Sequence, residues 1–160
     1  MAGLCLEGHN PAMRVARLPD KLRRFGGLSL ADKWLLGRAV VGLAIARVQL
    51  AVTPFERLAR RLSDEAGTAD TQADPELLRR VGFAVAAAAN NVPWRSDCFP
   101  QTIAARKLLR RYGYTSTIHL GVEKAGEEGI LGHAWLTRGG IVVTGGQELD
   151  RYVEMHRLGG

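Results

Sequence analysis

Cysteine is scarce in this sequence, and that scarcity excludes whole classes of protein. The chain of 160 residues holds two cysteines, Cys5 and Cys98. A single bridge between them would be a poor disulfide framework, so we expect reduced thiols in a cytoplasmic protein. No second ligand stands at the usual spacing from Cys98 or His133, which argues against a bound metal. Nothing in the sequence indicates a cofactor either.

A long uninterrupted apolar run is also missing. The most apolar stretch, residues 39–52, is broken by Arg47 and Gln49, and we expect it to be too short to cross a bilayer. The first ten residues lack a basic start followed by an apolar run, so no secretory signal is expected. We therefore expect no integral membrane segment, and a buried or partner-binding helix in this stretch.

The chain lacks a massed block of one charge. Lys and Arg number 22 against 16 Asp and Glu, a formal net charge of +6. The arginines are spread along predicted helix faces, so we interpret the charge mainly as favouring solubility. Attraction to an acidic peptide is the second interpretation, and no nucleic-acid partner is expected. The length favours one domain with a modest core.

Helix signals dominate the first two thirds of the chain. Ser29 and Asp32 form a capping-box pattern, and Thr53 with Pro54 repeats the signal of a helix start. Asp74 precedes the proline of a third start, and Cys98 begins a stretch with apolar residues at helical spacing. The basic residues of that last stretch are expected outside its apolar stripe. The pattern predicts helices over residues 30–52, 54–61, 75–90 and 98–112.

After residue 114 the sequence pattern changes to alternating apolar and polar residues, many of them β-branched. Strands are predicted over 115–122, 131–137 and 141–144, with a tight turn at Arg138-Gly139 or Gly139-Gly140. The last residues, 145–160, are expected to add a strand or a short helix. Helices followed by a small antiparallel sheet indicate an α+β fold.

Cys98 is the strongest candidate for chemistry because it stands at a predicted helix start. Unpaired N–H groups and the helix dipole favour an anion there, which lowers a thiol pKa. The same N–H groups can donate to an oxyanion, and Ser96 or Asp97 can cap the helix. The competing interpretation is that Cys98 is a small buried hydrophobe, which is the usual role of a free cysteine.

A histidine on a later strand would complete a cysteine nucleophile, and the sequence offers two. His119 and His133 both lie on predicted strands, so position alone does not choose between them. Small neighbours, Gly132 and Ala134, leave room for a substrate beside His133, and Trp135 could shield it from solvent. We therefore select His133 as the general base.

A third group usually orients the imidazole of such a pair. If Arg138 and Gly139 form the turn, Thr144 lies opposite His133 and is the first candidate. A shifted register would bring a glycine there, Gly145 or Gly146, and neither has a side chain. Two later carboxylates could reach back instead, those of Glu148 and Asp150.

The series of motifs resembles a known family. Residues 92–101 (VPWRSDCFPQ), 132–136 (GHAWL) and 142–146 (VVTGG), in this order, are similar to the transglutaminase-like leader peptidases of lasso-peptide biosynthesis. The resemblance implies a transglutaminase-like (papain-like) core over 75–160, with Cys98 as nucleophile and His133 as base. Residues 1–62 would form an N-terminal helical region, and 63–74 a polar linker.

The resemblance also implies partners. The family cuts the leader from a ribosomally made precursor peptide, and it works with a small leader-recognition protein and an ATP-dependent macrolactam synthetase. Because the 160 residues cover only the peptidase, a separate recognition protein is expected. The family often carries an aspartate one strand after the histidine, where this chain reads Val142 to Gly146 without an acid. Thr144, a later carboxylate and a two-residue site all remain open.

Two other functions stay open beside leader removal. Acyl transfer to an amine uses the same fold, and its products would be amides rather than acids. A non-catalytic peptide-binding scaffold would instead use the long apolar helix, residues 30–52, as a docking face. Rapid alkylation of Cys98 near neutral pH would separate an activated thiol from a scaffold's inert one.

Overall fold

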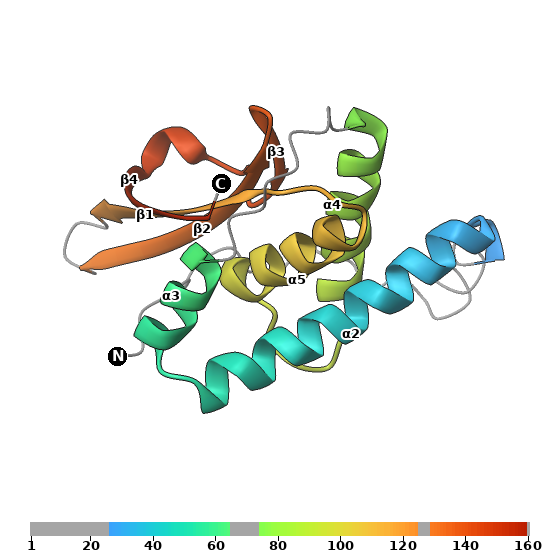
Figure 1. The fold of residues 1–160 in the computed structure, drawn as a ribbon, viewed down its shortest axis with the longest axis horizontal. Coiled ribbons are helices and arrows are strands. Elements are labelled where there is room, and N and C mark those ends of the chain that lie inside the picture. The colour runs from blue at the N-terminus through green and yellow to red at the C-terminus, as the bar shows by residue number, and fades with distance from the viewer. Residues whose placement is uncertain (1–25, 65–73, 125–128, 160) are drawn as a thin grey trace.

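The computed structural model describes residues 26–64, 74–124 and 129–159, and within these ranges helices come first and strands last (Figure 1). The linker predicted at 63–74 begins inside a helix, and residues 65–73 lie outside the described ranges. The elements are α2 (Leu30–Val52), α3 (Phe55–Asp64), α4 (Pro75–Ala89), α5 (Cys98–Arg111), β1 (Thr117–Lys124), β2 (Ile130–Arg138), β3 (Ile141–Thr144), the short 3-10 helix η2 (Leu149–Arg151) and β4 (Val153–Leu158).

The start of α2 confirms Ser29 as the N-cap and shows one of the two hydrogen bonds of the predicted capping box. The Ser29 hydroxyl oxygen accepts a hydrogen bond from the Asp32 backbone N–H at 3.1 Å. The Asp32 carboxylate accepts in turn from the Ser29 hydroxyl at 2.6 Å and from Arg80 of α4 at 2.7 Å. The Asp32 carboxylate therefore interacts with the N-cap residue of α2 and also joins this helix to α4.

The strands form one antiparallel sheet in the order β3-β2-β1-β4, which agrees with the α+β expectation. The chain after β3 supplies both elements expected of it, η2 and β4. The turn between β2 and β3 is Gly139-Gly140, and both residues have positive φ. This turn pairs Arg138 with Ile141, and the ladder has a separate register shift between Leu136 and Thr137.

This register corrects a sequence expectation. Thr144 lies opposite Leu136, and not opposite His133 as the alternative turn predicted. Two changes produce the difference. The turn uses two glycines in the left-handed region, which leaves Arg138 inside the strand and by itself would set Thr144 opposite Trp135. The register shift between Leu136 and Thr137 then moves Thr144 opposite Leu136.

The core lies between the helices and one face of the sheet. Helix α5 packs on the sheet with one side and on α2 with the other, as Figure 1 shows. Ile103 and Leu109 of α5 are fully buried, as are Ile118 and Leu136 of the strands. Helix α4 meets β3 closely, because a Cβ built on Gly82 would lie 2.2 Å from the Val143 carbonyl oxygen.

Helix α2 has the bounds that the sequence predicts, residues 30–52. Its 23 residues are long and apolar enough to cross a membrane by length and composition alone, and residues 39–52, which were expected to be too short, form only part of it. Arg47 and Gln49 do not end the helix because both have good helix propensity. In this fold, α2 packs against α4 and α5, and Arg80 of α4 pairs with Asp32 near its first turn.

Candidate active site

Cys98 is the first residue of α5, as the sequence predicts. Asp97 occupies the N-cap position, but its side chain makes no capping hydrogen bond. The Ser96 hydroxyl oxygen is buried and has no hydrogen-bond partner in the described part of the chain. Neither expected side chain therefore caps the helix, and the Asp97 carboxylate does not compete for its first N–H groups. Those groups are the ones that an oxyanion would use.

The sulfur of Cys98 is disulfide-bonded in the structure. This contradicts the expectation of reduced thiols. The other cysteine of the sequence, Cys5, lies outside the described residues. Because the thiolate is the attacking species in cysteine chemistry, Cys98 has to be reduced before it can act as a nucleophile.

The imidazole of His133 has a defined orientation on β2. Its Nε2 lies 2.8 Å from the backbone carbonyl oxygen of Gly145. A carbonyl oxygen only accepts hydrogen bonds, so Nε2 carries the proton and donates it. In the neutral ring, Nδ1 then keeps its lone pair and is the atom that can accept a proton.

The Gly145 carbonyl can approach His133 because residue 145 has no side chain. Its φ is +73°, a backbone conformation that side chains disfavour. A Cβ at this position would lie 2.4 Å from the carbonyl oxygen of Ala134, so the chain passes too close to β2 for any side chain. The sequence indicated only side chains as the third group, and this backbone acceptor was not predicted.

Tyr152 is a second residue of the site that was not predicted from the sequence. Its ring stacks on the His133 imidazole, with centroids 4.6 Å apart. Burial raises the pKa of the Tyr152 hydroxyl above its usual range, so the ring stays neutral beside the imidazole. A tyrosine near the chain's last strand carries no local signal that would have placed it on His133.

His119, the competing histidine, is held by other partners. Its Nδ1 lies 3.0 Å from the Glu154 carboxylate, and its Nε2 lies 2.7 Å from the Thr137 hydroxyl. Its ring also stacks on Trp135, at 5.2 Å between centroids. With both ring nitrogens engaged, His119 has no free position for proton transfer, which favours His133.

The other candidates for the third group make no hydrogen bond with His133 among the described residues. Thr144 is buried, and its hydroxyl oxygen has no hydrogen-bond partner within the described ranges. Glu148 pairs with Arg151, which also donates to Glu123 at 2.9 Å. Asp150 is exposed on η2. Gly145 is therefore the residue whose hydrogen bond orients the imidazole.

The meeting of sulfur and imidazole stays a prediction. Cys98 packs beside the apolar core, to which Ala134 and Leu136 of β2 also belong. Side chains alternate along a strand, so His133 and Trp135 lie on the opposite face from those two residues. Among the described residues, no group of three or more His, Cys, Asp or Glu could hold a metal ion.

The comparison with known proteins supplies a family assignment. Residues 39–157 match the Transglutaminase-like superfamily, and the match begins within α2 and ends within β4. No curated protein matches the chain. No solved structure matches it either.

Proposed function

Because the chain belongs to the transglutaminase-like superfamily, we propose that it is a cysteine peptidase that removes the leader from a ribosomally made lasso-peptide precursor. The superfamily includes cysteine peptidases and amide-forming acyltransferases, so the general chemistry follows from membership. The narrower assignment rests on the resemblance of residues 92–101, 132–136 and 142–146 to the leader peptidases.

One observation carries the enzymatic part of the proposal. The hydrogen bond from Nε2 of His133 to the Gly145 carbonyl fixes the tautomer in which Nδ1 is the proton acceptor. Cys98 begins a helix whose first N–H groups are not capped by Asp97. A base with a defined acceptor atom and a sulfur at an uncapped helix start are the two parts that thiol catalysis needs.

The proposed reaction requires the Cys98 sulfur and the His133 ring, which lie toward opposite faces of β2 in this structure, to meet at hydrogen-bonding distance. Nδ1 of His133 then takes the proton of the reduced Cys98 thiol. The sulfur then attacks the carbonyl carbon of the leader's last residue, and the Cys98 backbone N–H stabilises the oxyanion. The peptide C–N bond breaks as His133 returns the proton to the departing amine of the core peptide. Water, deprotonated by His133, then hydrolyses the thioester and releases the leader's carboxylate.

The proposal includes the partners that the resemblance implies. A separate leader-recognition protein presents the precursor, and a macrolactam synthetase closes the released core in the cytoplasm. Cleavage of the precursor is expected to be slow without the recognition protein, because nothing in the sequence indicates a dedicated leader-docking module.

The decisive assay incubates the reduced chain with precursor and recognition protein and identifies the products by mass. We expect a leader with a free carboxylate and a core with a free amine, and we expect no cleavage by the Cys98→Ala variant. Normal cleavage by that variant would disprove the nucleophile. Amide-linked products would instead identify an acyltransferase, and unchanged precursor with the reduced wild-type chain would favour the scaffold.

The contact between sulfur and imidazole has its own test, made in a Cys5→Ser background so that only Cys98 can be alkylated. We expect the half-maximal pH of alkylation to lie below that of a model thiol, about 8.5. His133→Gln should raise this midpoint by about one pH unit, because the imidazolium no longer stabilises the thiolate. His119→Gln is the matched control and should leave it unchanged. An equal midpoint in the His133 variant would mean that the pair does not form.

A further inference from the structure

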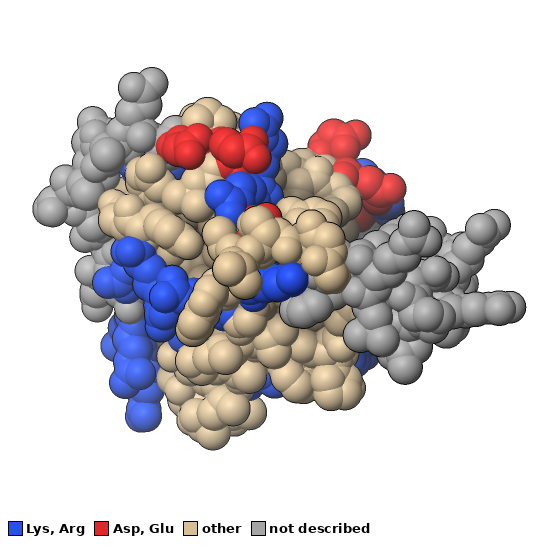
Figure 2. Space-filling view, turned by 90° about the vertical axis from the view of Figure 1, so that its right-hand side faces the viewer, with Lys and Arg blue, Asp and Glu red and all other residues tan. Residues whose placement is uncertain are grey.

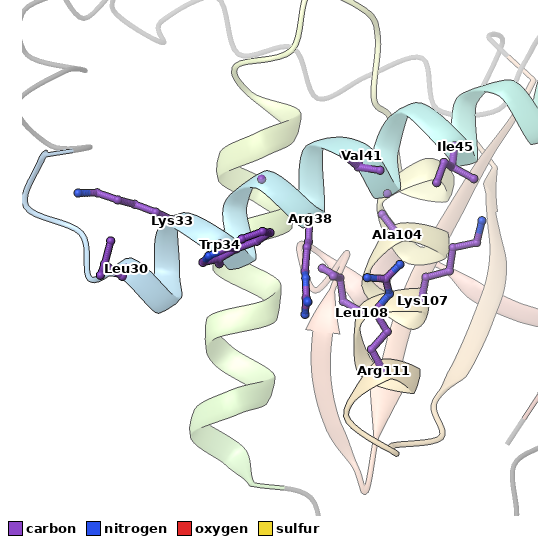
Figure 3. A pocket seen from close by; sticks show the side chains of 12 residues that line it. Leu30, Lys33, Trp34, Arg38, Val41, Ile45, Ala104, Lys107, Leu108 and Arg111 are labelled. Carbon is purple, nitrogen blue, oxygen red and sulfur yellow. The ribbon is translucent and has the colours of Figure 1, made fainter.

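A groove between α2 and α5 stands apart from the residues of the proposed reaction. It measures about 700 Å³, and its two walls are the outer side of α2 and the adjoining side of α5 (Figure 3). We call it the α2–α5 groove. Its lining residues are Leu30, Lys33, Trp34, Gly37, Arg38, Val41, Gly42, Ile45, Ala104, Lys107, Leu108 and Arg111.

Large apolar side chains line the α2 wall and remain exposed. Trp34 is 71% exposed and Val41 57% exposed, and Leu30 and Ile45 extend the same surface toward both ends. A soluble monomer rarely leaves a continuous surface of this kind open, and such surfaces often bind other proteins. The exposed indole is also the side-chain type that most often dominates binding energy at an interface.

The floor of the α2–α5 groove is built from residues with little or no side chain. Nothing lies within 4 Å of where a Cβ of Gly37 would be, and Gly42 faces Ala104 of α5 closely. The missing side chains leave a hollow between the two helices. A hollow with apolar walls accommodates the apolar face of a helix, as in helix-in-groove recognition.

The charge along the groove has one sign. Four lining residues are basic, Lys33 and Arg38 on α2 and Lys107 and Arg111 on α5, and no lining residue is acidic. Arg38 reaches from α2 toward Leu108 and Arg111, and its guanidinium lies 5.7 Å from the centroid of the Trp34 ring (Figure 3). On the face shown in Figure 2, Lys and Arg flank a broad uncharged area, whereas Asp and Glu gather at its upper end. A complementary partner is therefore acidic as well as apolar.

Charge also argues against the N-terminal segment and a second copy as occupants. Residues 1–25 hold five Lys or Arg against two Asp or Glu, so the N-terminal segment has the same sign as the groove. A second copy would set the four basic residues against their own equivalents. An anionic bilayer would match the charge, but a flat surface contacts a protruding ridge better than a hollow between two helices.

We propose that the α2–α5 groove binds an acidic amphipathic helix of a partner protein. The partner's apolar side chains lie against Trp34, Val41 and Leu108, and its carboxylates face Arg38 and Arg111. The α2 wall runs from residue 30 to residue 45, so a helix of about 15 residues, rising about 1.5 Å per residue, would fill it. This inference does not depend on the peptidase activity, because none of the lining residues takes part in the proposed reaction.

The test uses a peptide library with the full-length chain. Its members are about 16 residues long and carry apolar residues at positions i, i+3, i+4 and i+7, and their remaining positions are randomised between Glu and Lys. We expect selection for Glu, and we expect the affinity of the selected peptides to fall about tenfold in Trp34→Ser, the loss typical of a central aromatic residue. Phe83→Ser is the matched control, because Phe83 is 68% exposed on α4 and lies outside the groove.

A second variant tests the charge. The double substitution Arg38→Glu with Arg111→Glu should shift selection toward Lys, while circular dichroism confirms that the helices remain folded. Several results would overturn the proposal: no selected peptide, selection for Lys by the wild type, or equal binding by Trp34→Ser. Binding to phosphatidylglycerol vesicles that is lost in Trp34→Ser would assign the groove to lipid, and self-association lost in that variant would assign it to a second copy.

Discussion

At the scale of single residues, the orientation of the His133 imidazole depends on a backbone atom. The Gly145 carbonyl accepts from Nε2 at 2.8 Å, a role that enzymes with a cysteine–histidine pair commonly give to a side chain. A backbone acceptor is held by the strand geometry around it, so its direction is as well defined as the path of the chain. The residue that sets this path is Gly145 itself.

Gly145→Ala is expected to reduce precursor cleavage at least about tenfold, because its Cβ would push the carbonyl away from Nε2. Gly140→Ala is the matched control. Both positions have nearly the same positive φ, +73° and +78°, but nothing lies within 4 Å of a Cβ at Gly140. Both variants should lose about 1 kcal/mol of stability from backbone strain, and Gly145→Ala should lose more because its Cβ would meet the Ala134 carbonyl oxygen; urea unfolding measures both. Equal activity in both would show that the Gly145 carbonyl does not orient the base.

Thr144→Val separates the sequence-based candidate from the backbone acceptor. The Thr144 hydroxyl is buried without a hydrogen-bond partner in the described residues, so its replacement by a methyl group should stabilise the fold by up to about 1 kcal/mol. Cleavage should continue at the wild-type rate. A large loss of activity with unchanged stability would restore Thr144 as the third catalytic member.

The residues of the site differ in how far sequence could predict them. Cys98 at a helix start was predictable because helix caps and apolar spacing are local signals. His133 stood out by its small neighbours. The roles of Gly145 and Tyr152 depend on contacts between segments, and the Gly145 carbonyl has no side-chain identity that a pattern could recognise. The path of the chain alone decides where that oxygen lies.

At the scale of elements, Arg106 joins α5 to α3 and β4. The sequence placed it outside the apolar stripe, but its side chain is buried, which corrects that expectation. The guanidinium donates to the Leu62 carbonyl at 2.6 Å and to the Leu158 carbonyl at 2.9 Å. Helical spacing could not reveal this, because an arginine becomes buried only where acceptors on other elements satisfy it.

Arg106→Met keeps the length of the side chain but removes both donors. We expect unfolding to become easier by about 2–4 kcal/mol, because two carbonyl oxygens would lose their partners. Arg111→Met, on an exposed position of the same helix, is the control and should change stability by less than about 0.5 kcal/mol. Chemical denaturation of both variants measures the difference, and similar values would show that the Arg106 bonds contribute little.

The elements themselves were largely predictable. Helices and strands occur in the expected order because capping residues, prolines and alternation are encoded locally. Strand β1 begins at Thr117 rather than at residue 115, and the β2–β3 turn uses both glycines. These differences arise because ladder pairing between strands, which sequence alone does not show, decides where a strand begins and which turn residues are used.

At the scale of the whole molecule, the lowered pKa of one carboxyl group predicts how the stability of the fold depends on pH. Hydrogen bonds from Arg157 and, more weakly, from His119 lower the pKa of Glu154 from 4.5 to about 2. A carboxyl whose pKa is lower in the folded state stabilises the fold above pH 4.5 and loses that contribution as the pH falls toward 2. This carboxylate links β4 to His119 of β1.

Glu154→Gln should therefore be less stable than the wild type at neutral pH, by about 1 kcal/mol. The expected loss of stability is small because the Arg157 side chain is exposed to water, which weakens its ion pair with Glu154. The difference should shrink as the pH falls from 4.5 toward 2, as thermal unfolding across this range would show. Glu56→Gln, at an exposed position of α3, serves as the control. A difference that stays constant with pH would rule out the carboxylate as its source.

The close approach of α4 to the sheet has a consequence for the histidine. Gly82 lies close to the carbonyl of Val143, and two residues later, just past the end of β3, stands the carbonyl that holds His133. A methyl group added at residue 82 would shift β3 outward, and the displacement would reach Gly145 and rotate the imidazole. Packing of α4 against β3 therefore influences the orientation of the proposed base. Substitutions at this contact are expected to alter catalysis although they lie outside the site.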